Sequence, residues 1–187
     1  QYGIGIFGRV RQQKGVDLLV RASIPLLKKH SEFTVVICGE TTPDQQSFQD
    51  KLEAEVDAAG LTDRFLFLGK QPFSELPKLF KAMTIVTALS RNEGFGLTIL
   101  EAMASGVAVL ASEAGAWKDI VREGIDGHIV PCDDLSATQG KLDLMMSDPA
   151  QLVEMGTHGR ERVQQHYSLE REARDLTDFL RSLAVVE

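Results

Sequence analysis

Two glutamates bracket a short glycine-containing turn in the stretch RNEGFGLTILEAMASG, residues 91–106. Glu93 precedes the turn and Glu101 follows it, inside a segment whose apolar spacing predicts a helix. Gly94 and Gly96 would let a ligand approach the backbone, because neither residue has a Cβ. A helix that starts at such a turn presents unpaired N–H groups and a partial positive charge. These residues therefore indicate a binding site for an anion such as phosphate.

The backbone groups expected to bind that phosphate belong to the start of the helix, at Phe95, Gly96, Leu97 and Thr98. Glu101 lies about one turn further, roughly 6 to 8 Å along the helix axis. A carboxylate at that depth could accept hydrogen bonds from two vicinal hydroxyls of a ribose. Glu93, on the other side of the turn, would then face a hydroxyl-rich sugar. The pattern favours a nucleotide sugar as the ligand; the alternative is a helix-capping Glu93 and a solvated Glu101.

Basic residues follow the first apolar run, in GRVRQQKG at residues 8–15. Gly8 ends the expected strand, at the edge where open parallel sheets bind ligands. Arg9 and Lys14 could neutralise the charge of a diphosphate leaving group, because guanidinium and ammonium groups can stabilise such a charge without a metal ion. The alternative is that both are surface charges, which is how we interpret Arg11.

Neither a metal site nor a nicotinamide site is indicated. Asp133 and Asp134 are adjacent instead of forming a D-x-D pattern, and the four histidines do not cluster in the sequence. We therefore expect neither a metal nor another cofactor. The GIGIFG stretch, residues 3–8, matches a dinucleotide fingerprint, but its glycines lie inside the expected first strand instead of after it. For that reason we reject an NAD-binding interpretation.

The 187-residue chain is long enough for one domain and has ordinary hydrophobic (43%) and charged (25%) fractions. A net charge of −7 argues against a nucleic-acid partner, whose phosphates require clustered lysine and arginine. No apolar run of about 18 or more residues predicts a transmembrane segment. Because the chain begins at Gln1 and runs directly into a strand-like segment, we interpret it as a piece of a longer protein.

Short apolar runs alternate with helical patterns, which predicts a parallel sheet with right-handed crossovers. The expected strands are residues 4–8, 33–39, 65–69, 84–89, 107–112 and 127–131. The expected helices are residues 16–29, with a kink or break at Pro25, then 41–60, 74–83, 97–106, 133–148, 148–167 and 168–183. We expect a single α/β domain over residues 1–187: a Rossmann-like three-layer sandwich with a six-stranded parallel sheet at 1–131, and a helical tail at 132–187.

Together the motifs resemble a known family. The stretch GRVRQQKG followed by EGFGLTILEAMASG is similar to the C-terminal, donor-binding domain of retaining glycosyltransferases of family 4, which have the GT-B architecture. The similarity extends over nearly the whole chain, and the motifs look closest to those of bacterial lipopolysaccharide-core mannosyltransferases. One departure from the family pattern is Ile99, where many members have proline.

The resemblance implies roles for the candidate residues. Arg9 and Lys14 would bind the diphosphate, Glu93 would hold a hydroxyl of the donor sugar, and the turn would give backbone donors to sugar and phosphate. Glu101 would bind the ribose hydroxyls. The base would be faced by the loop after the third strand, at Lys70 and Gln71. The implied reaction transfers a sugar, mannose from GDP-mannose, to a glycan or lipid-linked acceptor, with retention at the anomeric carbon and without a metal.

A complete enzyme of this kind also has an N-terminal domain that binds the acceptor, which we expect to lie outside this chain. We therefore expect the chain to fold and to bind nucleotide weakly without turnover. Its C-terminal helices would cross back to that domain in a full-length protein, located in the cytoplasm or at the inner face of the membrane. Two alternatives stay open: a GT-B-like sugar-nucleotide epimerase, and a non-catalytic nucleotide-sensing or interaction module.

Overall fold

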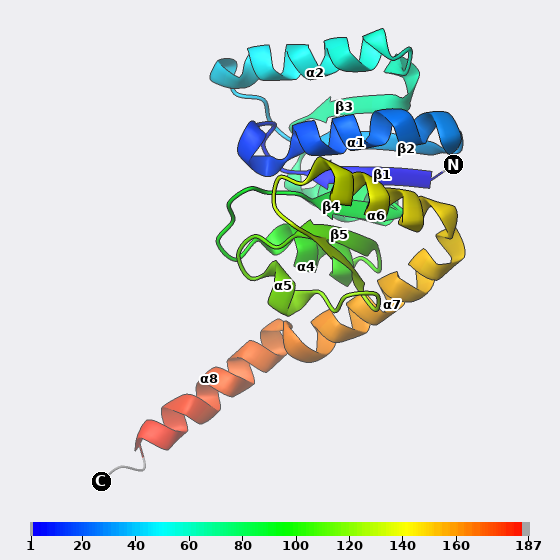
Figure 1. The fold of residues 1–187 in the computed structure, drawn as a ribbon. Coiled ribbons are helices and arrows are strands. Elements are labelled where there is room, and N and C mark those ends of the chain that lie inside the picture. Colours follow the sequence, from blue (N-terminus) through cyan, green and yellow to red (C-terminus); the bar gives the residue numbers. More distant parts are fainter. Residues whose placement is uncertain (1, 185–187) are drawn as a thin grey trace.

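A six-stranded parallel sheet forms the centre of the computed structural model, which describes residues 2–184 (Figure 1). Its strands are β1 (Tyr2–Phe7), β2 (Phe33–Cys38), β3 (Phe65–Gly69), β4 (Ile85–Ala88), β5 (Ala108–Ser112) and β6 (Gly127–Val130). Most strand residues are buried, because helices cover both faces of the sheet. The predicted α/β fold with a six-stranded parallel sheet is therefore confirmed.

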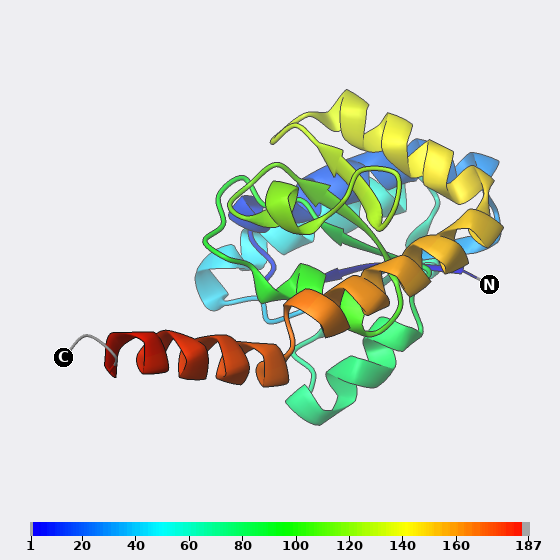
Figure 2. The ribbon, with the colours of Figure 1, turned by 90° about the horizontal axis from the view of Figure 1, so that it is seen from below.

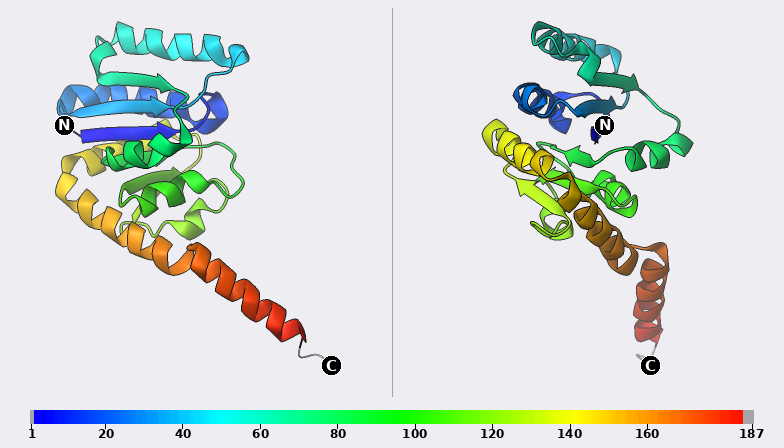
Figure 3. Two further views of the ribbon diagram at one scale, coloured as in Figure 1. Left: turned by 180° about the vertical axis from the view of Figure 1, so that it is seen from behind. Right: turned by 90° about the vertical axis from the view of Figure 1, so that its right-hand side faces the viewer.

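The helices form two layers, one on each side of the sheet, as the right panel of Figure 3 shows. One face is covered by α1 (Val16–Lys29), α2 (Gln46–Ala58) and α6 (Leu135–Ser147). The opposite face is covered by α3 (Leu76–Lys81), α4 (Leu97–Ala104) and α5 (Trp117–Ile120). The long helix α7 (Pro149–His166) connects the layers, because Leu152 belongs to the first apolar core and Val163 packs against the second.

The order of the strands defines where a ligand would bind. Along the sheet they run β3-β2-β1-β4-β5-β6, so the direction of winding reverses between β1 and β4. In open parallel sheets, ligands occupy the crevice outside the carboxyl ends of the strands at such a reversal. Gly8 follows β1 directly, and the loop at 89–96 follows β4. The topology thus brings the two candidate motifs to the same edge of the sheet.

Pro25 does not break the first helix, so the expectation of a break was wrong. Helix α1 continues from Val16 to Lys29 with Pro25 inside it. Leu19 and Leu26 lie on either side of the proline, and both are buried in the same apolar core, which holds the two halves of the helix together. The carbonyl that loses its intrahelical partner belongs to the exposed Arg21, where water can replace the missing N–H donor.

The last described helix, α8 (Leu169–Ala184), stands away from the rest of the molecule (Figures 1 and 2). Ser168 precedes the helix, and its Oγ accepts a hydrogen bond from the Arg171 N–H at 3.3 Å, as a capping serine does. Large apolar side chains remain exposed along it, at Leu169, Leu176, Phe179, Leu180 and Leu183. No helix within residues 2–184 combines the length and apolarity needed to cross a membrane.

Candidate functional site

A cavity of about 250 Å³ opens at the carboxyl edge of the sheet, where β1, β2 and β3 end and α4 begins. Six of the residues predicted from sequence line it: Gly8, Arg9, Lys70, Gln71, Thr98 and Glu101. Apolar side chains form its floor, among them Phe7, Leu76 and Phe80. Phe7 stacks on Phe80 with ring centroids 4.1 Å apart. We call this the donor cavity, after the ligand predicted from the sequence.

The segment after β5 packs against one side of the Gly-Phe-Gly turn at residues 94–96. The Trp117 indole Nε1 donates a hydrogen bond to the Gly96 carbonyl at 3.0 Å, and a Cβ on Gly96 would overlap the indole ring. Gly96 has a φ of 73° and Gly115 a φ of 55°, conformations that favour glycine. A Cβ on Gly115 would overlap the Gly94 carbonyl, whereas a Cβ on Gly94 would meet open space. The turn is therefore packed on one side and accessible on the other.

The start of α4 lies at this accessible side. Gly96 occupies the N-cap position, and no side chain within residues 2–184 caps the helix. The first turn also has no acidic residue. Helix N–H groups without intrahelical partners can bind an anion at such a terminus.

Glu93 is paired with Lys14. The Lys14 Nζ lies 2.5 Å from Glu93 Oε2, and the Ser90 Oγ donates to the same oxygen at 3.2 Å. Burial alone would raise the pKa of Glu93, but the hydrogen bond and charge of Lys14 outweigh that effect, so the pKa lies below its usual value. The aliphatic stem of Lys14 passes Gly8, where an added Cβ would lie 3.9 Å from its Cδ and Cε. The pair therefore borders the donor cavity without lining it.

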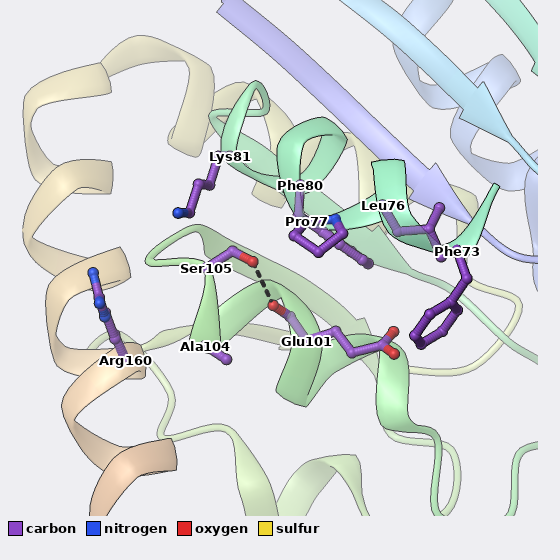
Figure 4. A pocket seen from close by; sticks show the side chains of 9 residues that line it. All are labelled: Phe73, Leu76, Pro77, Phe80, Lys81, Glu101, Ala104, Ser105 and Arg160. Atoms are coloured by element: carbon purple, nitrogen blue, oxygen red, sulfur yellow. Dashed lines mark hydrogen bonds between the residues drawn. The ribbon is translucent and has the colours of Figure 1, made fainter. Parts of the chain in front are cut away.

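Glu101 has the opposite environment. Its carboxylate makes no hydrogen bond or ion pair with any other residue in the described part of the chain, and burial raises its pKa. The side chain extends from α4 toward Phe73 (Figure 4). There it also lines a second cavity of about 390 Å³, whose walls are the apolar side chains of α3 and the Lys81 and Arg160 side chains. Glu101 thus offers two free carboxylate oxygens to a ligand in either cavity.

Arg91 ties the loop after β4 to the segment that carries Lys14. Its Nη1 and Nη2 lie 2.8 and 2.9 Å from the two carboxylate oxygens of Asp17, which is only 3% exposed. Its Nε donates to Asp133 at 2.9 Å, and its backbone N–H donates to the Gln13 carbonyl at 2.8 Å. The hydrogen bonds that Arg91 donates to Asp17 hold the pKa of Arg91 well above its ordinary value. Arg91 therefore fixes the relative positions of Glu93 and Lys14.

The side chains of the predicted residues Phe95 and Leu97 point away from the donor cavity and line a different groove. Phe95 and Leu97 are 52% and 61% exposed and line a groove with Tyr167 and Leu176, at the junction of α7 and α8. Only their backbone N–H groups were predicted to bind the ligand, and that prediction remains untested. Glu93, Lys14, Gly94 and Gly96 border the cavity instead of lining it.

Sequence reasoning missed several residues at this edge. Glu40 lines the donor cavity and its Oε2 lies 3.9 Å from the Lys70 Nζ; its position directly after a buried strand was the available signal. Arg91 gave no such signal, because its partners Asp17 and Asp133 are 74 and 42 residues away in the sequence. Within residues 2–184, no three histidine, cysteine or acidic side chains gather in a way that could bind a metal ion.

Comparison with known proteins identifies the family. Residues 2–162 match the family model of the group 1 glycosyl transferases, and the chain belongs to that family. It is 47% identical over 170 residues to the lipopolysaccharide core biosynthesis mannosyltransferase LpcC of Rhizobium leguminosarum bv. viciae, and 37% identical over 182 residues to LpsB of Rhizobium meliloti. These alignments cover 91% and 96% of this chain but 48% and 51% of the relatives, so the chain spans about half their length.

Solved structures show the same architecture. The C-terminal domain of the group 1 glycosyl transferase LpcC from Francisella tularensis matches with a TM-score of 0.86 and 39% identity, over 90% of this chain and 87% of that one. Anabaena HepE in complex with UDP matches with a TM-score of 0.87 over 97% of this chain and 49% of that one. At 23% identity, the second match supports the fold alone.

Proposed function

We propose that this chain is the donor-binding part of a retaining mannosyltransferase, which transfers mannose from GDP-mannose to a glycan or lipopolysaccharide-core acceptor. The observation that carries the proposal is the donor cavity, which gathers Gly8, Arg9, Lys70, Gln71, Thr98 and Glu101 from three separate segments of the chain. The 47% identity to a lipopolysaccharide-core mannosyltransferase supports the choice of sugar and acceptor class.

The diphosphate of the donor binds between the start of α4 and the basic segment after β1. The N–H groups of Phe95, Gly96, Leu97 and Thr98 donate to its oxygens from the uncapped helix terminus. Arg9 approaches from the donor cavity, and Lys14 from the side of Glu93. Charge-assisted hydrogen bonds of this kind are about twice as strong as neutral ones.

The nucleoside occupies the donor cavity itself. Glu101, whose carboxylate is free of protein partners among the described residues, accepts hydrogen bonds from the two ribose hydroxyls. The base lies toward Lys70 and Gln71, on the loop that follows β3. The apolar floor of Phe7 and Phe80 excludes water beneath the ligand.

The protein contributes mainly charge stabilisation and positioning to the transfer. Negative charge develops on the diphosphate as the bond to the anomeric carbon breaks, and Arg9 and Lys14 stabilise it. The leaving diphosphate takes the proton of the acceptor hydroxyl, so no protein base is required. Because the pKa of Glu93 is lowered, this side chain is a carboxylate at neutral pH and serves to orient a sugar hydroxyl instead of donating a proton.

Calorimetric titration with GDP-mannose, GDP, UDP and ADP tests the proposal. We expect GDP-mannose and GDP to bind most tightly, and Glu101→Ala to weaken both about tenfold or more, because hydrogen bonds to a charged group contribute about 1.5–3 kcal/mol. Glu154→Ala on α7 is the matched control, since Glu154 is exposed and lines neither the donor cavity nor the groove beside Phe95 and Leu97. If no nucleotide binds better than phosphate buffer, the proposed function is wrong; unchanged GDP affinity in Glu101→Ala would refute the role of Glu101.

The exposed face of α8 docks onto the acceptor-binding domain of a longer protein, which acts in the cytoplasm or at the inner face of the membrane. Support comes from the row of exposed leucines on α8 and from relatives about twice as long as this chain. Alone, the chain then binds donor without transferring sugar. Replacing Leu176 and Leu180 with serine should leave GDP affinity unchanged and reduce association with a separately produced N-terminal half of a relative. Sugar transfer by the chain alone would contradict the proposal that transfer requires the acceptor-binding domain.

A further inference from the structure

The donor cavity contains a carboxylate that the proposed function does not use. Glu40 lies on the loop after β2 and lines the cavity together with Lys70 and Gln71, which face the base in the proposed complex. Arg9 and Glu101, the other charged residues described in the lining, already have ligand groups assigned to them. The position of Glu40 at the base end of the cavity makes it a candidate for recognising the base.

Backbone hydrogen bonds fix the loop of Glu40 between the loops on either side of it. The Val10 N–H donates to the Glu40 carbonyl at 2.9 Å, which ties Glu40 to the segment after β1. The Gly39 N–H donates to the Gly69 carbonyl at 3.0 Å, which ties the same loop to the end of β3. Glu40 and Lys70 directly follow the two glycines that this second hydrogen bond joins. Their backbones therefore hold a defined relative position before any ligand binds.

The side chains of Glu40 and Lys70 are neighbours that do not satisfy each other. Glu40 Oε2 lies 3.9 Å from Lys70 Nζ, which is too long for a hydrogen bond, and neither group has another polar partner within residues 2–184. The Gln71 amide is already used, because its Nε2 donates to the Leu68 carbonyl at 2.6 Å. The base end of the cavity thus presents an unsatisfied acceptor, the carboxylate, beside an unsatisfied donor, the ammonium group.

Guanine matches this pair of groups better than adenine or uracil does. Its N1–H and its 2-amino group are adjacent donors, which the two oxygens of one carboxylate can accept together, and its O6 can accept from an ammonium group. Adenine offers a carboxylate only its 6-amino group. Uracil offers only N3–H, which lies between two carbonyl oxygens that a carboxylate repels. The arrangement of Glu40 beside Lys70 therefore favours guanine first and uracil last.

We propose that Glu40 is the residue that selects guanine as the base of the donor. Its carboxylate accepts hydrogen bonds from N1–H and the 2-amino group, while Lys70 donates to O6. A base without the two donors leaves the carboxylate desolvated and unpaired, and such a loss gives strong discrimination. The ribose and the diphosphate, which all nucleoside diphosphates share, bind elsewhere in the site. The inference deepens the proposed function and rests on it, because a nucleotide must occupy the donor cavity.

Calorimetric titration of Glu40→Gln with GDP, inosine diphosphate, xanthosine diphosphate and UDP tests the proposal. Inosine lacks the 2-amino group, and xanthosine has a carbonyl oxygen in its place. The unmodified chain should bind GDP at least tenfold more tightly than either analogue, because both lose a hydrogen bond to a charged group. In Glu40→Gln, GDP should weaken at least tenfold and xanthosine diphosphate should strengthen, because the new amide N–H can donate to the extra carbonyl oxygen. UDP affinity should change less than twofold, which reports that the cavity is intact.

The outcomes separate this inference from the function on which it rests. Glu154→Gln is the matched control, because it removes the same charge from an exposed position on α7 and should change no affinity more than twofold. If Glu40→Gln leaves the ratio of GDP to UDP affinity unchanged, Glu40 does not select the base, and the inference is wrong while the proposed function stands. The same conclusion follows if inosine diphosphate binds the unmodified chain as tightly as GDP does. If no nucleotide binds better than phosphate, both proposals are wrong.

Discussion

Glu93 and Glu101 stand at the two ends of one turn, and the structure surrounds them in opposite ways. Glu93 is neutralised by Lys14 and fixed by Ser90, and its pKa is lowered. The Glu101 carboxylate has no protein partner within residues 2–184, and its pKa is raised by burial. A carboxylate that is paired is held in one position, whereas an unpaired one keeps both oxygens free for a ligand. The protein thus fixes the Glu93 end of the turn and leaves the Glu101 carboxylate without a partner among the described residues, as the proposed hydrogen bonds to the ribose require.

The largest expected effect comes from removing the residue that holds the Glu93 end in place. Arg91→Ala leaves Asp17 buried with only the more distant Arg21, at 3.6 Å, so we expect a loss of roughly 3 kcal/mol in the free energy of unfolding. Urea denaturation measures it. Arg21→Ala is the matched control, because Arg21 is exposed and its loss should cost about 1 kcal/mol or less. If both variants lose the same free energy of unfolding, Arg91 contributes no more to stability than an exposed arginine, and the prediction is wrong.

A smaller effect should follow from removing the partner of Glu93 while Arg91 still holds the loop after β4 in place. Lys14→Met deletes one of the two cations proposed for the diphosphate, and we expect GDP affinity to fall about tenfold. The pKa of Glu93 should rise, because its hydrogen bond and opposite charge are lost, while the pKa of Glu101 should not change. Carbon-detected NMR titration of the glutamate carboxyls follows both groups. A parallel rise in both pKa values would mean that the two ends are not independent.

The smallest effects, of opposite sign, should come from neutralising each glutamate. The lowered pKa of Glu93 gives stability that is present above the unfolded-state pKa and lost as the pH falls through the folded-state value. The raised pKa of Glu101 gives stability that is present at low pH and lost as the pH rises through its folded-state value. At pH 7, Glu93→Gln should therefore destabilise the chain and Glu101→Gln should stabilise it, each by less than Arg91→Ala. Thermal unfolding at pH 7 and pH 4 tests the signs, and a shift of the same sign in both variants would contradict the comparison.

Local patterns were sufficient to predict the sheet and much of the donor cavity. Each strand is a short apolar run, and parallel topology places the ends of such runs at one edge, which is why Gly8 could be located without a structure. The Lys70–Gln71 pair was located through the family resemblance instead. The turn and Glu101 were predictable because glycine spacing and helix geometry act over a few residues.

Long-range pairing could not be predicted in this way. The Lys14–Glu93 pair joins residues 79 positions apart, and nothing in either segment indicates that the two charges neutralise each other. The same holds for Arg91, whose partners come from α1 and from the loop before α6. Pro25 was misjudged for a related reason, because burial of Leu19 and Leu26 in one core outweighs a local helix-breaking preference.

Trp117 is the only tryptophan of the chain, and its indole N–H is hydrogen-bonded to the carbonyl of Gly96. The only tryptophan fluorophore of the chain is thus hydrogen-bonded to the backbone at which the donor diphosphate is proposed to bind. A ligand that binds to the backbone of this turn should change the polarity around the indole. The wavelength and intensity of the tryptophan fluorescence should change with it. Occupancy of the site can therefore be followed optically in the unmodified chain, without a label and without a reaction to monitor.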